Sequence, residues 1–230
     1  GFYEICPHAD CVDESFIKEV EKLFGTFERN KNTHKHEDKP TFHANTLSRK
    51  KETEQAHLCL GYRGLPIGHP ESYSLIIMNN VLGGSMSSRL FQEVREQRGL
   101  AYSVYSYHSS YKDNGLVTIY GGTGASQMNL LFETIQNTLA TFKQDGITSK
   151  ELTNSKEQLK GNLMLSLEST NSRMSRNGKN ELMLGKHRSL DEIIQLIDKV
   201  TEESVMNMTK QVFTDEYSVA YISPVENLSV

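Results

Sequence analysis

The chain has 230 residues, of which 25 are basic and 29 acidic, so its formal net charge is −4. This length fits one large domain or two small ones, and it suffices to bury a sizeable core. The negative charge gives no electrostatic reason to expect nucleic acid or an anionic membrane as a partner. No apolar run approaches the roughly 18 residues that span a bilayer. We therefore expect neither nucleic acid nor a membrane among its partners.

The first residues lack Met, and they also lack the basic and apolar regions of a signal peptide. We therefore expect a cut or processed chain. Three cysteines, Cys6, Cys11 and Cys59, form no dense disulfide framework, which is typical of a reduced, intracellular setting. A cytoplasmic location is the default expectation.

Two short segments contain residue types that bind metals. Cys6, His8 and Cys11 are close enough to suggest a metal clip, but no second Cys/His pair has the spacing of a structural zinc site. The histidines and carboxylates of residues 34–38 lie in a charged connector that has no rigid shell to fix ligands. The eight histidines include no H-x-x-E-H or H-E-x-x-H pair. The sequence therefore predicts no metal site in this chain.

The N-terminal part divides into a helix and a connector. Apolar residues recur at three- and four-residue steps over 13–24 and stop at Gly25, which predicts an amphipathic helix. Residues 28–40 carry nothing apolar to bury and end in a proline. We expect this charged stretch to be a linker.

Beyond the linker, strands and helices alternate irregularly. Residues 55–62 alternate between apolar and polar, which predicts a strand. An Asn-Gly turn at 114–115 predicts a hairpin between the β-rich runs 102–111 and 116–120. The other expected elements are marked by caps, glycines and periodicity. They are helices 70–83, 87–99, 131–146, 149–168 and 173–184, a helix that starts at 189, a helix 201–212 and a strand at 219–222. This order predicts an α+β fold, a two-layer sandwich of a mostly antiparallel sheet packed against several helices, and does not fit a doubly wound fold.

The glycine cluster at 121–124 follows a strand and precedes a helix. It lacks both the G-x-G-x-x-G spacing and a following Lys-Ser/Thr, so it is no nucleotide-binding signature. We expect a tight strand-to-helix turn there. No G-x-S-x-G elbow occurs, and Cys59 lies inside an alternating strand, where a small core residue is the default interpretation.

Arg95 and Tyr102 are the candidate functional residues. Arg95 is expected near the end of a helix and Tyr102 at the start of the next strand, so the turn can bring both side chains to one side. Together they would offer a cationic fork and a phenolic donor, suited to peptide carbonyls or a developing oxyanion. The residues alone favour a structural role, since Arg is common at helix ends and Tyr at strand edges.

A functional role becomes the favoured interpretation once the surrounding sequence is considered. Residues 87–106 read S-S-R-L-F-Q-E-V-R-E-Q-R-G-L-A-Y-S-V-Y-S. This run resembles the C-terminal half of the pitrilysin–insulinase–mitochondrial processing peptidase family of zinc peptidases with the inverted H-x-x-E-H motif. The family's Arg and Tyr are seven residues apart, as are Arg95 and Tyr102. The resemblance extends more loosely over 41–223. It implies that 1–28 is the end of an N-terminal peptidase lobe, 29–40 the interlobe linker and 41–230 the C-terminal lobe.

The resemblance also implies a function. Zinc and the general-base Glu would belong to the preceding half, whereas this chain, inactive alone, would supply Arg95 and Tyr102 for substrate binding and transition-state stabilisation in a clamshell chamber. The implied partners are a peptide substrate, the N-terminal lobe, and a second copy or homologous subunit. Two alternatives stay open: a non-peptidase partner subunit, and a structural core protein of the same fold.

Overall fold

The computed structural model describes residues 13–27 and 40–224. The chain divides into two compact units, whose described parts are 13–27 with 160–189 and 40–159 with 190–224. The possible metal clip at Cys6, His8 and Cys11 and nearly all of the expected linker lie outside the described residues.

Besides residues 160–166, the end of a longer helix, the first unit contains two helices with local capping signals. In α1 (Glu14–Phe24), the Asp13 carboxylate accepts a hydrogen bond from the backbone N–H of Phe16 at 2.9 Å. In α5 (Thr170–Leu184), the Ser169 hydroxyl accepts one from Ser172, and Gly185 ends the helix in the left-handed region. The cap at Ser169 starts α5 three residues before the expected position.

The second unit is built on a five-stranded sheet of order β1-β5-β2-β4-β3. Its strands are β1 (Thr46–Lys50), β2 (Ala56–Arg63), β3 (Ala101–Ser110), β4 (Gly115–Thr123) and β5 (Ser218–Ser223). Only the β1–β5 pair is parallel, and the other neighbours are antiparallel. The expected hairpin is formed by β3 and β4, and the predicted mostly antiparallel sheet is confirmed.

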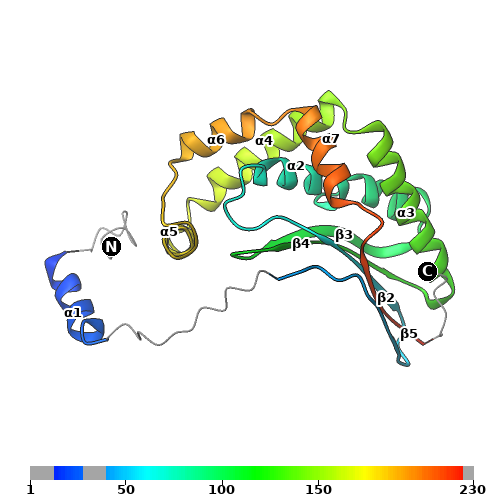
Figure 1. Ribbon diagram of the computed structural model, residues 1–230, viewed down its shortest axis with the longest axis horizontal. Coiled ribbons are helices and arrows are strands. Elements are labelled where there is room, and N and C mark those ends of the chain that lie inside the picture. The colour runs from blue at the N-terminus through cyan, green and yellow to red at the C-terminus, as the bar shows by residue number, and fades with distance from the viewer. Residues whose placement is uncertain (1–12, 28–39, 225–230) are drawn as a thin grey trace. The chain divides into compact units, whose positions relative to one another are not determined.

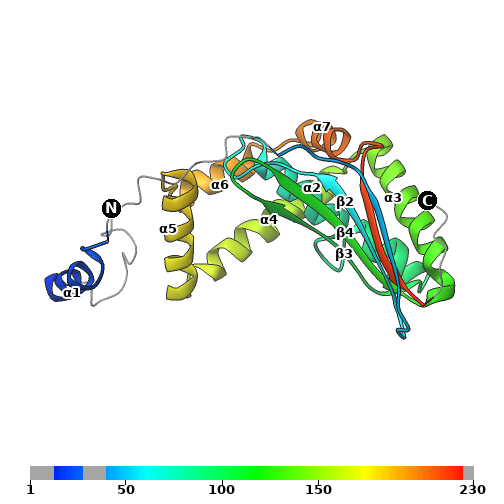
Figure 2. The same cartoon turned by 60° about the horizontal axis from the view of Figure 1, so that its bottom comes forward.

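Helices cover one face of this sheet (Figure 1, Figure 2). The helical elements of the unit are α2 (Ser72–Gly83), the π-helix η2 (Phe91–Gln97), the short 3-10 helix η3 (Ala125–Gln127), α3 (Met128–Asp145), the start of α4 (Ser149–Ser166), α6 (Leu190–Asp198) and α7 (Glu202–Val212). Fully buried side chains of β2, α2, α3 and α7 meet between sheet and helices, among them Leu58, Ile77, Leu131 and Val205. The α+β sandwich is therefore confirmed.

Local capping signals predict helix starts well. Thr148 and Glu151 form a reciprocal cap at the start of α4, and Thr201 with Ser204 forms another at α7. Each of these starts depends on residues three positions apart, so the sequence alone contains the whole signal.

Three features differ from expectation. Strand β1 has no predicting signal, because all five of its residues are exposed and none alternates with a buried neighbour. The expected helix 87–99 is wound over Phe91–Gln97 as a π-helix. The prediction of a turn at 121–124 is wrong for its first three residues, which belong to β4. At Gly121 a Cβ would lie 2.9 Å from a terminal methyl of Leu131 on α3, so the glycine lets this helix pack closely on the strand.

Helix α2 and strand β3 approach unusually closely at Gly83. A Cβ on Gly83 would lie 2.5 Å from the backbone nitrogen of Ser106. Two hydrogen bonds join the same elements: the Asn79 amide donates to the Ser106 carbonyl at 3.3 Å, and the Ser106 hydroxyl donates to the Asn79 carbonyl at 3.2 Å. This contact fixes β3, the edge strand that begins just before Tyr102.

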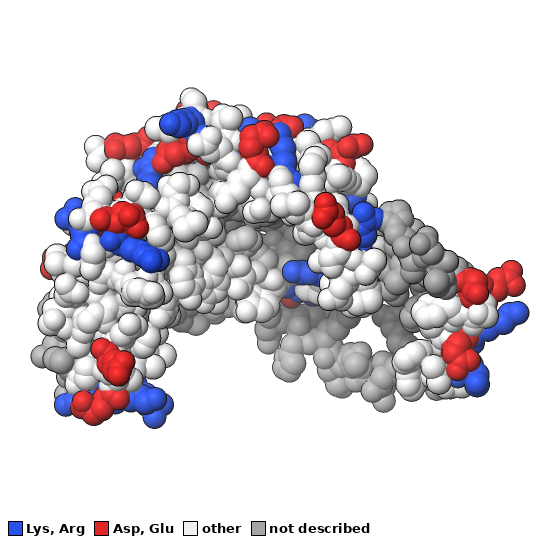
Figure 3. Space-filling view, turned by 180° about the vertical axis from the view of Figure 1, so that it is seen from behind, with Lys and Arg blue, Asp and Glu red and all other residues white. Residues whose placement is uncertain are grey.

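The surface charges fit the expectation from composition. On the face drawn in Figure 3, Lys and Arg are interspersed with Asp and Glu and form no extended area of one sign. Among the described helices, none is long and apolar enough to cross a bilayer.

Candidate functional site

The structure brings Arg95 and Tyr102 together. The Cζ atom of Arg95, near the end of η2, lies 5.3 Å from the centre of the Tyr102 ring and 4.9 Å from that of Phe91. Both distances are within the range of cation–π attraction. The adjacency predicted from the seven-residue spacing is therefore confirmed.

A bulge directs Tyr102 toward solvent. In the β3–β4 ladder, Ala101 pairs with Thr123 and Ser103 with Gly122, so Tyr102 is an extra residue without a cross-strand partner. Bulges of this kind re-aim side chains and are common next to active sites. Tyr102 is 75% exposed, which leaves its hydroxyl accessible.

A shallow pocket of about 370 Å³ lies beside the two residues. It is lined by Gln55, Arg95, residues 99–102, residues 122–124 and Gln127. Arg95 is the one charged residue among these lining residues, and they include no carboxylate. Within the described part of the chain, the guanidinium contacts two aromatic rings and no acidic partner.

The open face of the sheet continues from this pocket. Gly122 is flanked in register by His57 on β2 and Ser103 on β3. Tyr120 lies on the same face and shares a hydrogen bond of 2.8 Å between its hydroxyl and Nδ1 of His57. Burial, followed by the neighbouring Tyr105 and Cys59, raises the pKa of Tyr120, so its hydroxyl stays protonated at neutral pH.

Sequence reasoning missed Gln55, His57, Gly122 and Tyr120 as neighbours of the site. The alternation over 55–62 places His57 on one face of its strand, but the hydrogen bond to Tyr120 joins residues 63 positions apart. Only the register of the sheet brings them together. Cys59 is half-buried on that face, and burial raises the pKa of its thiol, which opposes nucleophilic reactivity.

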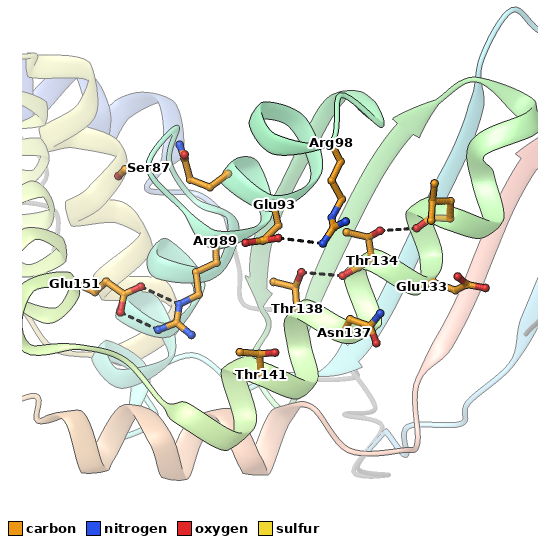
Figure 4. Close-up of a pocket in the computed structure, with 12 residues that line it drawn as sticks. Ser87, Arg89, Glu93, Arg98, Glu133, Thr134, Asn137, Thr138, Thr141 and Glu151 are labelled. Atoms are coloured by element: carbon orange, nitrogen blue, oxygen red, sulfur yellow. Dashed lines mark hydrogen bonds and ion pairs between the residues drawn. The ribbon is translucent and has the colours of Figure 1, made fainter.

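A second, larger cavity of about 570 Å³ lies between the segment 87–98 and helix α3, with Glu151 at one end (Figure 4). Its charged groups largely pair with one another. Arg89 binds Glu151 at 2.8 Å, and Arg98 lies 3.6 Å from Glu93. Thr134 and Thr138 donate to carbonyls of their own helix. Both arginines of this cavity thus face carboxylates, unlike Arg95.

The Arg95–Tyr102 pair has donors but no base. A guanidinium carries five N–H donors and a phenol one O–H donor, which suits a carbonyl oxygen that gains negative charge. Among the described residues, no group of three or more His, Cys, Asp or Glu side chains could hold a metal ion. The described residues therefore do not fit a zinc site, and the pair can bind and polarise a carbonyl without itself activating water.

Comparison with known proteins identifies the family. The family described as the Peptidase M16 inactive domain matches residues 10–159. A Bacillus subtilis strain 168 protein named "Uncharacterized zinc protease YmxG" is 65% identical over 217 residues, which are 94% of this chain and 53% of that protein. The chain thus spans about half the length of this relative.

Solved structures show the same fold. A protease from Helicobacter pylori has a TM-score of 0.77 at 20% identity, covering 93% of this chain and 53% of that one. A peptidase M16 inactive domain from Pseudomonas fluorescens has a TM-score of 0.73 at 24% identity, covering 80% of this chain and 44% of that one. The resemblance carried by residues 87–106 is confirmed, and the chain belongs to the Peptidase M16 inactive domain family.

Proposed function

We propose that this chain is the C-terminal, non-metal-binding lobe of a zinc-dependent endopeptidase, and that Arg95 and Tyr102 bind the substrate peptide. The observation that carries the proposal is the contact between the two side chains: Arg95 Cζ is 5.3 Å from the Tyr102 ring, and Tyr102 is exposed. Family membership and a 65% identical relative named a zinc protease support it.

In this proposal, zinc and the water-activating Glu belong to the preceding half of the protein. The guanidinium of Arg95 and the hydroxyl of Tyr102 donate hydrogen bonds to a peptide carbonyl oxygen. As that oxygen gains charge, both bonds strengthen, so the pair stabilises the transition state more than the ground state. The two aromatic contacts of Arg95 hold its guanidinium in place without neutralising its charge.

The domain division is part of the proposal. Residues 1–28 would end the N-terminal lobe, 29–40 would link the lobes, and 41–230 would form the C-terminal lobe. The charged, apolar-free composition of 29–40 supports the linker. Limited proteolysis of the full-length protein should cut first within 29–40, and a first cut within 41–223 would contradict this division.

The test of the pair is kinetic. In the full-length protein, Arg95→Ala and Tyr102→Phe should each lower kcat/KM for peptide hydrolysis by about 10²–10³-fold, the usual cost of losing an oxyanion donor. Thermal stability and zinc content should stay unchanged. Because both donors serve one oxygen, the double variant should lose less than the product of the single losses.

Matched controls are available nearby. Arg98 belongs to the same segment but faces Glu93, and Tyr111 is an exposed tyrosine in the β3–β4 loop. Arg98→Ala and Tyr111→Phe should leave kcat/KM within about twofold of the wild type. Near wild-type activity of both Arg95→Ala and Tyr102→Phe would refute the proposed role. A full-length wild type that neither binds zinc nor hydrolyses peptides would instead favour a non-peptidase partner subunit or a structural core protein.

A further inference from the structure

We propose that the pocket lined by Gln55, Arg95 and Gly122 is a specificity subsite that takes an uncharged or acidic side chain of the bound peptide and disfavours a basic one. The inference rests on the proposed function, because Arg95 and Tyr102 both line this pocket. It adds a substrate class and a set of residues that determine it.

Gly122 contributes only backbone atoms to the lining of this pocket. His57, Gly122 and Ser103 lie side by side on β2, β4 and β3. A Cβ on Gly122 would lie 3.0 Å from the Tyr120 hydroxyl and 3.5 Å from Oε1 of Gln55. The Tyr120 hydroxyl and the Gln55 amide oxygen therefore lie close over Gly122, and a methyl group there would displace one of them beside the pocket.

The Tyr120 hydroxyl is held in position at the border. It shares a 2.8 Å hydrogen bond with His57, and its ring packs 5.0 Å from the ring of Tyr105 on β3. A fixed hydroxyl loses little entropy when a ligand binds, so it can contribute to selectivity. Tyr120 thus holds a fixed polar group over Gly122, next to the residues that line the pocket.

The charge of the lining sets the preferred side chain. Arg95 is the one charged residue that lines the pocket, and Gln55, Tyr102 and Gln127 supply neutral polar groups. A carboxylate entering the pocket would meet a guanidinium, whereas a Lys or Arg side chain would meet a like charge with no acidic group in the lining to offset it. The subsite therefore favours acidic and neutral side chains over basic ones.

Gly122→Ala tests the size of the subsite with little risk to folding. Gly122 lies in a strand and does not use the left-handed region, so its backbone accepts alanine. The new methyl would displace the tip of one side chain by a few tenths of an ångström. Gly61→Ala is a matched control, because Gly61 is on the same face and its Cβ would meet only the Ser218 side chain, at 3.9 Å.

The experiment uses the full-length protein and fluorogenic peptides that differ at one position near the scissile bond. Each position is varied in turn through Ala, Leu, Glu and Lys. At the position that occupies the subsite, the wild type should cleave the Leu and Glu peptides with kcat/KM about tenfold above that for the Lys peptide. Gly122→Ala should lower kcat/KM for Leu and Glu about tenfold and leave the Ala peptide within twofold, and Gly61→Ala should change none of them.

A second variant and a second measurement test the subsite independently of Gly122→Ala. Tyr120→Phe removes the hydroxyl without adding volume and should lower kcat/KM for the Glu peptide several-fold while sparing the Leu peptide. Dissociation constants of the same labelled peptides, measured with the zinc chelated, should show the same order of preference. Equal effects of Gly122→Ala on all four peptides at every position, in both readouts, would overturn the subsite.

Arg95→Ala separates this inference from the proposed function. If Arg95→Ala lowers hydrolysis of every peptide and Gly122→Ala does not discriminate among them, only the subsite is refuted. If Arg95→Ala and Tyr102→Phe have no effect, the proposed role of the pair is refuted. A size-selective effect of Gly122→Ala in that case would still support the subsite.

Discussion

The guanidinium of Arg89 binds the carboxylate of Glu151 through two hydrogen bonds, from Nε to Oε1 at 2.8 Å and from Nη2 to Oε2 at 2.9 Å (Figure 4). Nη2 also donates to the carbonyl of Gly146 at 2.7 Å, and the guanidinium lies 4.9 Å from the Phe142 ring. Glu151 in turn accepts from the backbone N–H of Thr148. The segment before η2, the end of α3 and the start of α4 therefore meet at one ion pair.

This ion pair predicts a pH-dependent stability. Burial of the Glu151 carboxyl opposes ionisation, but the hydrogen bonds from Arg89 and Thr148 outweigh it and lower the pKa from 4.5 to about 2. Because the pKa of Glu151 is lower in the folded protein, its ionised carboxylate stabilises the fold at pH values above the unfolded-state pKa near 4.5. This stabilisation is lost as the pH falls toward about 2. Glu151→Gln should lower the free energy of unfolding by about 1–2 kcal/mol at pH 7, because the partial exposure of the side chain weakens the ion pair. At pH 2 the loss should be almost nothing.

The measurement is urea unfolding of wild type and Glu151→Gln at several pH values. Glu203, exposed in the first turn of α7, serves as the control: Glu203→Gln should change the free energy of unfolding by less than about 0.5 kcal/mol. A difference between wild type and Glu151→Gln that stays constant from pH 7 to pH 2 would show that the charge of Glu151 does not contribute.

The close approach of α2 to β3 gives a second prediction. Gly83→Ala would place its methyl 2.5 Å from the Ser106 nitrogen, a backbone atom that cannot move aside without breaking the hydrogen bonds to Asn79. We expect a loss of about 3 kcal/mol or more in the free energy of unfolding. Gly161→Ala, in the interior of α4 with nothing within 4 Å, should instead gain up to about 1 kcal/mol. Denaturant titration compares the two, and equal effects would contradict the steric explanation.

How far the sequence predicts this structure depends on the range of each signal. Helix caps such as Thr148 with Glu151 involve neighbouring residues and were predictable. The contact of Arg95 with Tyr102 spans one turn, so spacing and family resemblance sufficed. The hydrogen bond between His57 and Tyr120 beside Gly122 was not predictable, because only strand register brings the two residues together. Strand β1 was missed because all five of its residues are exposed, so no alternation of buried and exposed residues marks it. Only its pairing with β5 defines it as a strand.

The third prediction concerns metal content. The described residues offer no cluster of three metal-binding side chains, and the sequence contains no paired-histidine motif. We expect the 230-residue chain to retain less than about 0.1 zinc ion per molecule after dialysis and to hydrolyse no peptide, because zinc needs about four ligands in a fixed geometry. Elemental analysis measures the metal. Stoichiometric zinc, with peptide hydrolysis lost on chelation, would contradict this prediction and direct attention to Cys6, His8 and Cys11.

The last prediction concerns where the Arg95–Tyr102 pair acts. Because the family resemblance implies a second copy as a partner, we expect the pair to reach the zinc site of the facing subunit. Full-length subunits that lack the zinc site would then be mixed, after unfolding and reassembly, with Arg95→Ala subunits. In each mixed dimer one site loses both its zinc and its Arg95, while the other combines an intact zinc site with an intact pair. Random assembly gives about half mixed dimers with one working site each, so activity should return to about a quarter of the wild type. If the pair acts within its own chain, every site in the mixed dimer lacks one component, and mixing should restore nothing.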